Sequence, residues 1–341
     1  MSKMTNAAFT AAEAASKTAA SGGQPLLQVQ NLKKQYKQKE NIVQAVDDVD
    51  ISLQAGEILG VVGESGCGKS TLARCIIRLL DVDGGSILWQ GSDISHYSEK
   101  KMRGLRSQIQ MIFQNPYASF NPRFSVGHAL QQVAKFYGLK PEEYQAKVKE
   151  LLAYCDIDEE LLERRPSQLS GGQLQRLAIV RALLPSPKLL IADEAVSALD
   201  VSIQESILVL LRDLRERYGI AVLFISHDLA VVKALCQRVV VMYRGRIVEE
   251  GDTQEIFRAP AHPYTRALLS ARPRLGERRN DERILLKGDV SDISGCENGC
   301  LFANRCFAAQ VDACRKVRPQ MRKMSDDHMV SCHIKYEEEK I

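Results

Sequence analysis

A glycine-rich segment, GESGCGKST, constrains the fold more than any other feature of the sequence. It follows the apolar run EILGVV and precedes KSTLARCIIRLL, which has a helical pattern. Glycines let successive backbone N–H groups turn toward one anion, and the following helix adds its positive N-terminal end. Lys69 can reach the β- and γ-phosphates of a nucleotide, and Ser70 can hold Mg²⁺. The candidate phosphate-binding residues are Gly63, Glu64, Ser65, Gly66, Cys67, Gly68, Lys69, Ser70 and Thr71.

Apolar runs elsewhere predict the fold around this loop. KLLIADE (188–194) and IAVLFISHD (220–228) are typical of central parallel strands that are covered on both faces. Helical patterns lie between such runs, which predicts an α/β fold with a mostly parallel sheet. LLQVQNLKKQY and VQAVDDVDISLQAGE alternate apolar and polar residues, as half-buried antiparallel strands do. RVVVMYRGRIVEEG indicates a hairpin with its turn near Arg244 and Gly245.

Composition and pattern predict how the chain is divided. Residues 1–25 are expected to be a disordered polar tail, and 26–260 the main α/β domain with a helical subdomain at about 115–181. Residues 261–290 are expected to be a linker, and 291–336 a cysteine-rich C-terminal module. The net charge of +4 over 341 residues argues against a nucleic-acid binder that relies on a basic face. No apolar run is long enough for a membrane helix, and we expect a cytosolic protein with reduced thiols.

Two carboxylates end the apolar run LLIADE. Asp193 is placed where it can bind Mg²⁺ directly or through water. Glu194 follows it and can polarise a water that attacks the γ-phosphate. Taken alone, Glu194 could equally be a solvated acid at the end of a strand.

LSGGQ offers a hydroxyl and exposed amides at the start of a helix, which makes a second candidate anion site. Two half-sites for one nucleotide suggest that two chains face each other. The alternative is an ordinary serine N-cap followed by a glycine-rich turn. The residues concerned are Ser170, Gly171, Gly172 and Gln173.

These motifs, in this order, closely resemble those of ATP-binding cassette (ABC) ATPases over residues 26–260. They are the phosphate loop, Gln114 after an apolar strand, LSGGQ, LLIADE, SALD at 197–200 and ISHD around His227. The resemblance implies that Gln114 senses Mg²⁺ and links the site to partner subunits. It implies that Asp200 organises a dimer interface and that His227 contacts the γ-phosphate. Tyr36 occupies the place of an aromatic residue that stacks on adenine, although a tyrosine there could simply pack.

One departure from the family pattern lies beside the catalytic acid. The family usually has Pro-Thr after the glutamate, whereas this chain has Ala195 and Val196. Neither position supplies a side-chain group to the implied reaction, so we expect an active site. Alanine does not fix φ as proline does, which leaves the stiffness of this loop open. The implied reaction is in-line attack of water on the γ-phosphate at a closed dimer interface.

NPYASFNPR (115–123) and HPYTRALLSARP (262–273) resemble the ATPases of oligopeptide and dipeptide importers, whose relatives also import nickel and oligosaccharides. The resemblance implies an ATPase that powers peptide import from the cytoplasmic face of the inner membrane, bound there peripherally. Its implied partners are a second ABC ATPase subunit, a paralogue being favoured over a second copy, two transmembrane permeases and an extracytoplasmic solute-binding protein. Nucleic acid is not among them. The competing classes are a soluble non-transport ABC ATPase and a redox sensor with a vestigial cassette.

The C-terminal cysteines match a further pattern of this importer family, G-C-x-F-x-x-R-C followed by two more cysteines. In some relatives, four such thiolates hold a [4Fe–4S] cluster. The resemblance therefore implies a cluster on Cys300, Cys306, Cys314 and Cys332, favoured over zinc or an empty site. Asn304, where proline is common, and the additional Cys296 depart from the pattern. The four remaining cysteines are expected to be inert: Cys67, Cys75, Cys155 and Cys236.

Overall fold

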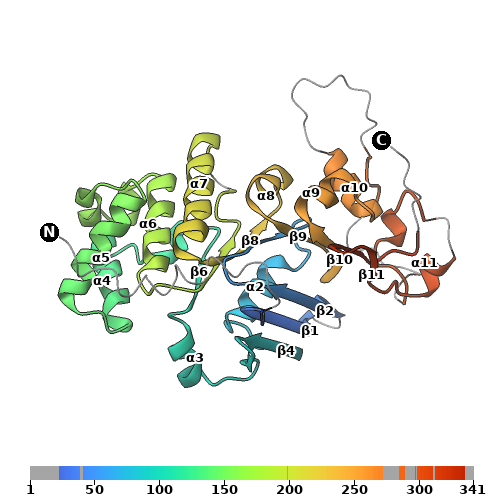
Figure 1. Cartoon of the computed structure of the whole chain (residues 1–341), viewed down its shortest axis with the longest axis horizontal. Coiled ribbons are helices and arrows are strands. Elements are labelled where there is room, and N and C mark those ends of the chain that lie inside the picture. Colours follow the sequence, from blue (N-terminus) through green and yellow to red (C-terminus); the bar gives the residue numbers. More distant parts are fainter. Residues whose placement is uncertain are drawn as a thin grey trace.

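The predicted apolar runs form the centre of an eight-stranded sheet in the computed structural model (Figure 1). The model describes residues 23–38, 41–197, 199–271, 284–288, 296, 298–309 and 312–334. The tail predicted over 1–25 therefore lies almost wholly outside the described residues. Along the sheet the strand order is β11-β12-β10-β9-β3-β8-β7-β6.

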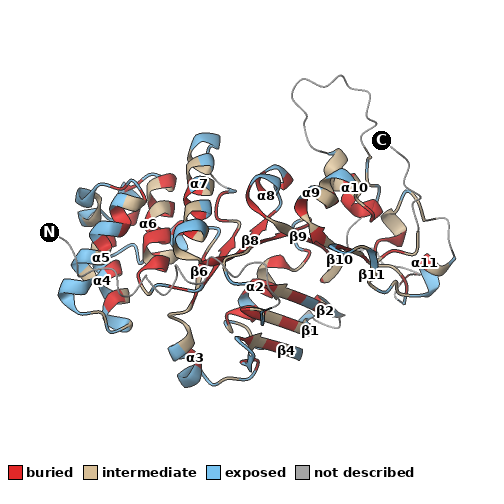
Figure 2. Cartoon of the chain, viewed as in Figure 1, coloured by how far each residue is buried: buried red, intermediate tan, exposed pale blue. Residues whose placement is uncertain are grey.

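The five strands from β9 to β6 run parallel, as the alternation of strands and helices predicts. Every residue of β3, β7 and β8 is buried, because helices and a second sheet cover the two faces. Figure 2 shows this burial concentrated along the central strands. The parallel strands are β3 (Ile58–Val62), β6 (Ile109–Ile112), β7 (Leu189–Asp193), β8 (Ala221–Ser226) and β9 (Arg238–Tyr243).

Alternate residues of these strands enter two separate cores. Ile58 and Val62 of β3 pack in the core on the side of α6, α7 and α8, whereas Leu59 and Val61 pack in the core on the side of α2. Side chains of a strand point alternately to its two faces, which explains the division. The helices are α2 (Lys69–Ile76), α7 (Val201–Tyr218) and α8 (Leu229–Leu235).

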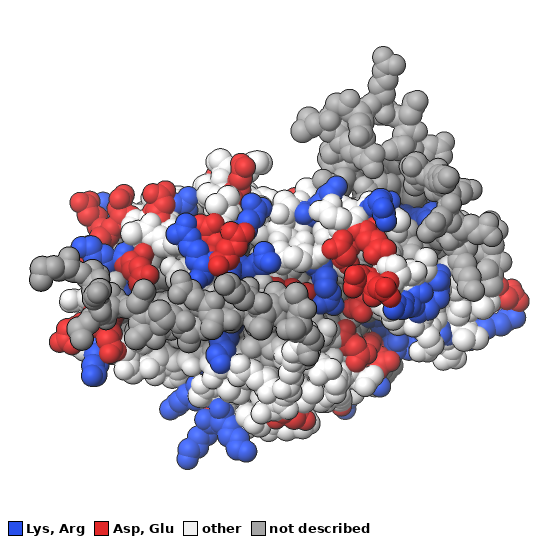
Figure 3. All heavy atoms as spheres, viewed as in Figure 1, with Lys and Arg blue, Asp and Glu red and all other residues white. Residues whose placement is uncertain are grey.

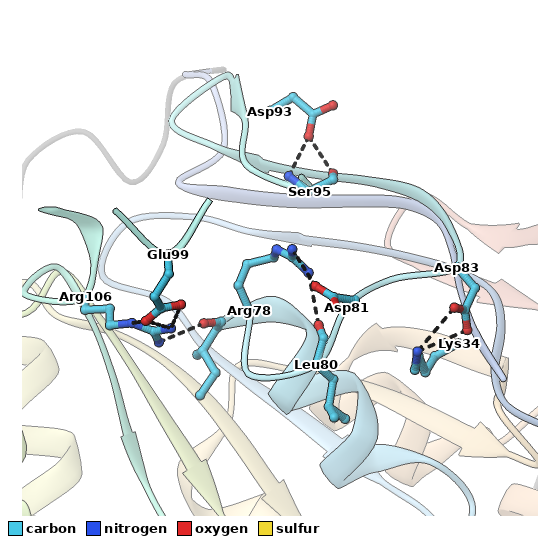
Figure 4. Close-up of polar contacts among 10 residues, drawn as sticks. Lys34, Arg78, Leu80, Asp81, Asp83, Asp93, Ser95, Glu99 and Arg106 are labelled. Carbon is cyan, nitrogen blue, oxygen red and sulfur yellow. Dashed lines mark hydrogen bonds and ion pairs between the residues drawn. The ribbon is translucent and has the colours of Figure 1, made fainter. Parts of the chain in front are cut away.

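A four-stranded antiparallel sheet, in the order β2-β1-β4-β5, covers the α2 side. Ion pairs and hydrogen bonds fasten the turns around it, including Lys34–Asp83 at 3.2 Å and Asp93 with Ser95 (Figure 4). Arg106 pairs with Glu99 nearby, at the start of α3. The elements are β1 (Leu27–Gln38), β2 (Asn41–Leu53), β4 (Gly84–Trp89), β5 (Ser92–Asp93) and α3 (Glu99–Leu105).

Helices occupy the segment between β6 and β7, as predicted for about 115–181. They group at one end of the molecule (Figure 1), where Leu130, Leu151 and Leu177 enter the larger core. None of the helices in the described residues is long and apolar enough to cross a bilayer. The segment holds η1 (Pro116–Ser119), α4 (Val126–Phe136), α5 (Pro141–Tyr154), η2 (Glu159–Glu163), η3 (Pro166–Gln168) and α6 (Gly171–Leu183).

The C-terminal part joins the same sheet. β9 and β10 form the predicted hairpin around Arg244 and Gly245, and β12 then pairs with β10, Val330 lying opposite Glu249. The buried Glu249 carboxylate accepts hydrogen bonds from the Ala261 and His262 amides and contacts His328 Nε2 at 2.7 Å. One side chain thus ties three segments together. The elements are β10 (Arg246–Asp252), α9 (Thr253–Arg258), η4 (Ala303–Arg305), α11 (Ala313–Lys316), β11 (Arg322–Ser325) and β12 (His328–Val330).

The first part of the predicted linker, 261–290, forms a buried helix that begins at the His-Pro-Tyr segment. α10 (Pro263–Ser270) starts with proline at its first turn, and the His262 side chain caps it by accepting the Tyr264 N–H. Tyr264 is fully buried. Proline and N-cap signals favour a helix start, although the apolar pattern here is too short to indicate one by itself. Residues 272–283 lie outside the described part of the chain.

Candidate functional site

The glycine-rich loop lies between β3 and α2. At two of its glycines, neighbouring backbone leaves no room for a side chain. Gly63 and Gly68 have φ values of +155° and +108°. A Cβ on Gly63 would lie 2.2 Å from the Met242 carbonyl oxygen, and one on Gly68 would lie 2.0 Å from that of Ala45. Both the positive φ and the close approach therefore require glycine. The buried Lys69 ammonium donates to the Gly63 oxygen at 2.8 Å and the Glu64 oxygen at 3.0 Å, within its own loop.

Ser70 and Asp193 meet at the carboxyl edge of the parallel sheet. The Ser70 hydroxyl donates to Asp193 Oδ1 at 2.8 Å, joining the first turn of α2 to the end of β7. Burial raises the pKa of Asp193, although the Ser70 hydrogen bond opposes this. A hydroxyl and a carboxylate at this spacing are hard oxygen ligands of the kind that Mg²⁺ prefers.

Three further predicted residues converge beside this pair. Gln114 Nε2 donates to Glu194 Oε2 at 2.9 Å, and His227 Nδ1 lies 3.4 Å from the same oxygen. The three follow β6, β7 and β8, whose carboxyl ends are neighbours in a parallel sheet. Glu194 has φ +48°, and its N–H donates to the Ile225 oxygen at 3.0 Å, which fixes its backbone. The Glu194 side chain is only 13% exposed.

Ala195 and Val196, which depart from the family pattern, lie in a turn directly after Glu194. Both side chains are buried, and the Ser197 N–H donates to the Glu194 oxygen to close a turn. Packing of two apolar side chains thus restrains the loop in place of a proline ring. Ala198 lies outside the described residues.

The LSGGQ segment lies at the start of α6, on the opposite side of the sheet from α2. Ser170 Oγ accepts the Gln173 N–H, and Gln173 Oε1 accepts the Ser170 N–H, which is a capping box. Within one chain, Ser170 therefore serves as the N-cap that was the alternative interpretation. Asp200 likewise caps α7 by accepting the Ile203 N–H. Tyr36 lies on β1 with 37% of its surface exposed.

Sequence reasoning missed two contacts to the phosphate loop. The Glu64 N–H donates to Tyr264 Oη at 2.8 Å. The Glu64 carboxylate accepts two hydrogen bonds from Arg305, at 2.7 and 3.1 Å. Tyr264 belongs to the His-Pro-Tyr segment and Arg305 to the cysteine pattern, so both stretches were noted, but neither was connected to the loop.

The four matched cysteines line one small cavity, together with His262 and His333. Burial raises the pKa of Cys300 to about 12 and that of Cys306 to about 11, and it also raises the pKa of Cys332. Cys296 is fully buried beside Cys314 and Cys300 but is not in the cavity lining. In the described part of the chain, no three His, Cys, Asp or Glu side chains are arranged as a metal site.

The four other cysteines, Cys67, Cys75, Cys155 and Cys236, are buried. Burial raises the pKa of Cys67, of Cys75 to about 11 and of Cys155 to about 12. It also raises the pKa of Cys236. A buried thiol with a raised pKa forms little of the reactive thiolate.

Comparison with known proteins agrees with this geometry. Residues 46–197 match the family model described as ABC transporter, and residues 248–314 match the one described as oligopeptide/dipeptide transporter, C-terminal region. The chain is 46% identical to the probable peptide ABC transporter ATP-binding protein y4tS of Sinorhizobium fredii, covering 91% of this chain and 90% of that one. It is 43% identical to the oligopeptide transport ATP-binding protein OppF of Haemophilus influenzae, covering 89% and 92%.

A solved structure is also similar. It is a dimeric ATP-binding cassette in a post-hydrolysis state, bound to ADP and phosphate. It matches with a TM-score of 0.62 and 28% identity, covering 67% of this chain and 98% of the other. The chain therefore belongs to the ABC transporter family, as an ATPase subunit of the oligopeptide/dipeptide group.

Proposed function

We propose that this subunit hydrolyses ATP to power the import of peptides through a membrane ABC transporter. The observation that carries the proposal is the convergence of Ser70, Asp193, Gln114, Glu194 and His227 at one edge of the sheet, beside the phosphate loop. The peptide substrate rests on the names of the relatives, since the solute is held by other subunits. The same importer class also handles nickel and oligosaccharides, but no observation here favours those solutes.

The geometry supports a role for each group in hydrolysis. The loop amides and Lys69 bind the phosphates, and the ammonium has a third N–H beyond the two that the loop carbonyls accept. Glu194, held by Gln114, accepts a proton from the attacking water, while His227 contacts the γ-phosphate. Ser70, Asp193 and Gln114 would hold Mg²⁺, and the bound ion would neutralise charge on the phosphates.

We place Tyr36 against the adenine ring, and Ser170 to Gln173 against the γ-phosphate of a facing subunit, with Asp200 at that interface. The capping box engages the amides of Ser170 and Gln173, so those of Gly171 and Gly172, in the first turn of α6, are the ones that would bind an anion. The facing subunit is a paralogue rather than a second copy. The assembly includes two permeases and, through them, an extracytoplasmic binding protein, and lies on the cytoplasmic face of the membrane.

A mixing experiment on homodimers of the purified subunit, formed without the paralogue, tests whether facing subunits share each site. Lys69→Ala should weaken ATP binding, and Ser170→Ala should abolish hydrolysis while ATP still binds. Dimers that combine the two variants contain one intact composite site and one doubly damaged site, so partial ATPase activity should return. If no mixture recovers activity although mixed dimers form, the two residues do not serve facing sites.

We also propose that Cys300, Cys306, Cys314 and Cys332 hold a [4Fe–4S] cluster. Their convergence on one cavity, and a donor set of four thiols, support the assignment. A bound cluster would cross-link the segments that carry these cysteines. Zinc and an empty site remain the alternatives. The domain division into a cassette at 26–260 and a cysteine module at 291–336 is part of the same proposal.

A further inference from the structure

Glu64 of the phosphate loop is held by the C-terminal part of the chain at two different groups. Its amide donates to Tyr264 Oη, and its carboxylate accepts both terminal nitrogens of Arg305. Its carbonyl oxygen is occupied by Lys69. The amide, the carbonyl and the carboxylate of Glu64 are therefore all engaged. Its contacts with Tyr264 and Arg305 join residues that are 200 and 241 positions apart in the sequence.

The ion pair is shielded from solvent on the arginine side. The Arg305 side chain is 7% exposed and that of Glu64 is 26% exposed. Two parallel hydrogen bonds between a guanidinium and a carboxylate form a stronger and more directional pair than a single contact does. A guanidinium stays protonated at any working pH, so Arg305 supplies a positive charge to this pair.

Arg305 is itself fixed by the fold around it. Its guanidinium lies 5.9 Å from the centroid of the Tyr243 ring and donates to Tyr243 Oη at 3.4 Å. Tyr243 packs edge-on against Phe302, whose ring also contacts Tyr264. Arg305 ends η4, directly before Cys306, so the segment that positions it also lines the cysteine cavity.

We propose that Arg305 is a positioning residue for the phosphate loop, through which the cysteine module sets the affinity of the loop for ATP. The proposal rests on the ATP-binding role of the loop given above. Glu64 places a negative charge in a loop that must bind a polyanion, and Arg305 neutralises it. The ion pair with Arg305 and the hydrogen bond to Tyr264 together hold Glu64 in place. Less conformational freedom of the loop is therefore lost when ATP binds.

Because the proposal depends on charge, the single and double variants should differ in their affinity for ATP. In Arg305→Gln the Glu64 carboxylate is left without its cation, and the Kd for ATP should rise about tenfold, equivalent to about 1.4 kcal/mol. In the double variant Arg305→Gln with Glu64→Gln, the repelling charge is gone and much of the affinity should return. If Arg305 merely stabilised the fold, the second substitution would not restore the affinity for ATP. Binding is measured by titrating ATP into the full-length subunit.

Three further variants complete the experiment: one control, one that tests the Tyr264 contact and one that separates the two proposals. Arg318→Gln removes another C-terminal arginine, one that pairs with Asp47 at 3.5 Å, and should leave the Kd for ATP unchanged. Tyr264→Phe removes only the hydroxyl that accepts the Glu64 amide, and should raise the Kd with no change of charge. Lys69→Ala separates the two proposals: if it abolishes ATP binding while Arg305→Gln has no effect, only the positioning role fails.

The link to the module has its own test. Cys306→Ser changes a side chain that lines the cysteine cavity directly after Arg305, and we expect it to loosen this segment and raise the Kd for ATP in the otherwise unchanged chain. In the Arg305→Gln background it should add nothing, because the connection is already broken. A Cys306→Ser effect that persists in that background, or no effect in the unchanged chain, would overturn the link. An unchanged Kd in Arg305→Gln, or no rescue in the double variant, would overturn the positioning role.

Discussion

Replacing Glu194 with glutamine isolates proton transfer from the rest of the site. The glutamine keeps the shape of the side chain, and its Oε1 can still accept the hydrogen bond that Gln114 donates at 2.9 Å. The backbone bond from residue 194 to Ile225 is also unaffected. The substitution removes the negative charge and the oxygen lone pair that takes the proton from water.

The expected loss follows from that single change. Positioned general bases contribute about 10²- to 10⁴-fold to rate. At about 1.36 kcal/mol for each factor of ten, the barrier should rise by about 2.7–5.4 kcal/mol. The substitution alters none of the proposed phosphate-binding groups, so the Kd for ATP should stay within about threefold, or about 0.7 kcal/mol.

Phosphate release by the assembled transporter measures the rate, and titration of ATP into the subunit measures the binding. Glu57→Gln is a matched control, because Glu57 is another shielded glutamate, paired with Arg238 at 2.8 Å outside the site. It should leave kcat unchanged. A rate within a few-fold of wild type in Glu194→Gln would refute the assignment of Glu194 as the base, and equal losses in both variants would indicate a general effect on folding.

Three other predictions concern the C-terminal part and the antiparallel sheet. Phe302→Ala should lower the free energy of unfolding by about 3–5 kcal/mol, since its buried ring packs against three other rings; a loss below about 1 kcal/mol in denaturant titration would contradict this. Anaerobically purified protein should be brown with about four irons per chain, and Cys306→Ser should bleach it while Cys296→Ser should not; one zinc per chain in a colourless sample would reject the cluster. Hydrogen bonds from the Gln35 amide, mainly, and from Lys34 lower the pKa of Asp83. The ionised carboxylate therefore stabilises the fold fully above its usual pKa near 3.8, and this contribution is lost as the pH falls through the lowered pKa. Asp83→Asn should therefore reduce the thermal midpoint at pH 7 more than at pH 3, and an equal reduction at both would exclude the ionic contribution.

The charges on the surface give little guidance to function. Figure 3 shows lysine and arginine side chains interspersed with aspartate and glutamate on the face in view. This agrees with the small net charge of +4. The information on function lies instead in the loop after β3 and in the ends of the parallel strands.

The sequence alone located the candidate nucleotide site, because most of its motifs are short and continuous. The phosphate loop is a continuous segment whose glycines, lysine and serine act at fixed spacing. Asp193 and Glu194 end one buried strand, and parallel strands bring their carboxyl ends to one edge of the sheet whatever the details of packing. The roles of Gln114 and His227 were implied only by the resemblance to ABC ATPases. The structure brings both residues to Glu194 because the three follow neighbouring parallel strands.

Tertiary structure alone decided how the C-terminal part is attached. No local pattern indicates that β12 pairs with β10, or that the helix at residues 263–270 is buried. The partner of Glu64 is Arg305, 241 positions away, and many arginines in the chain could have satisfied a glutamate equally well by charge. Which one does so depends on where Phe302, Tyr243 and Tyr264 pack, and that packing is settled only when the whole sheet has formed.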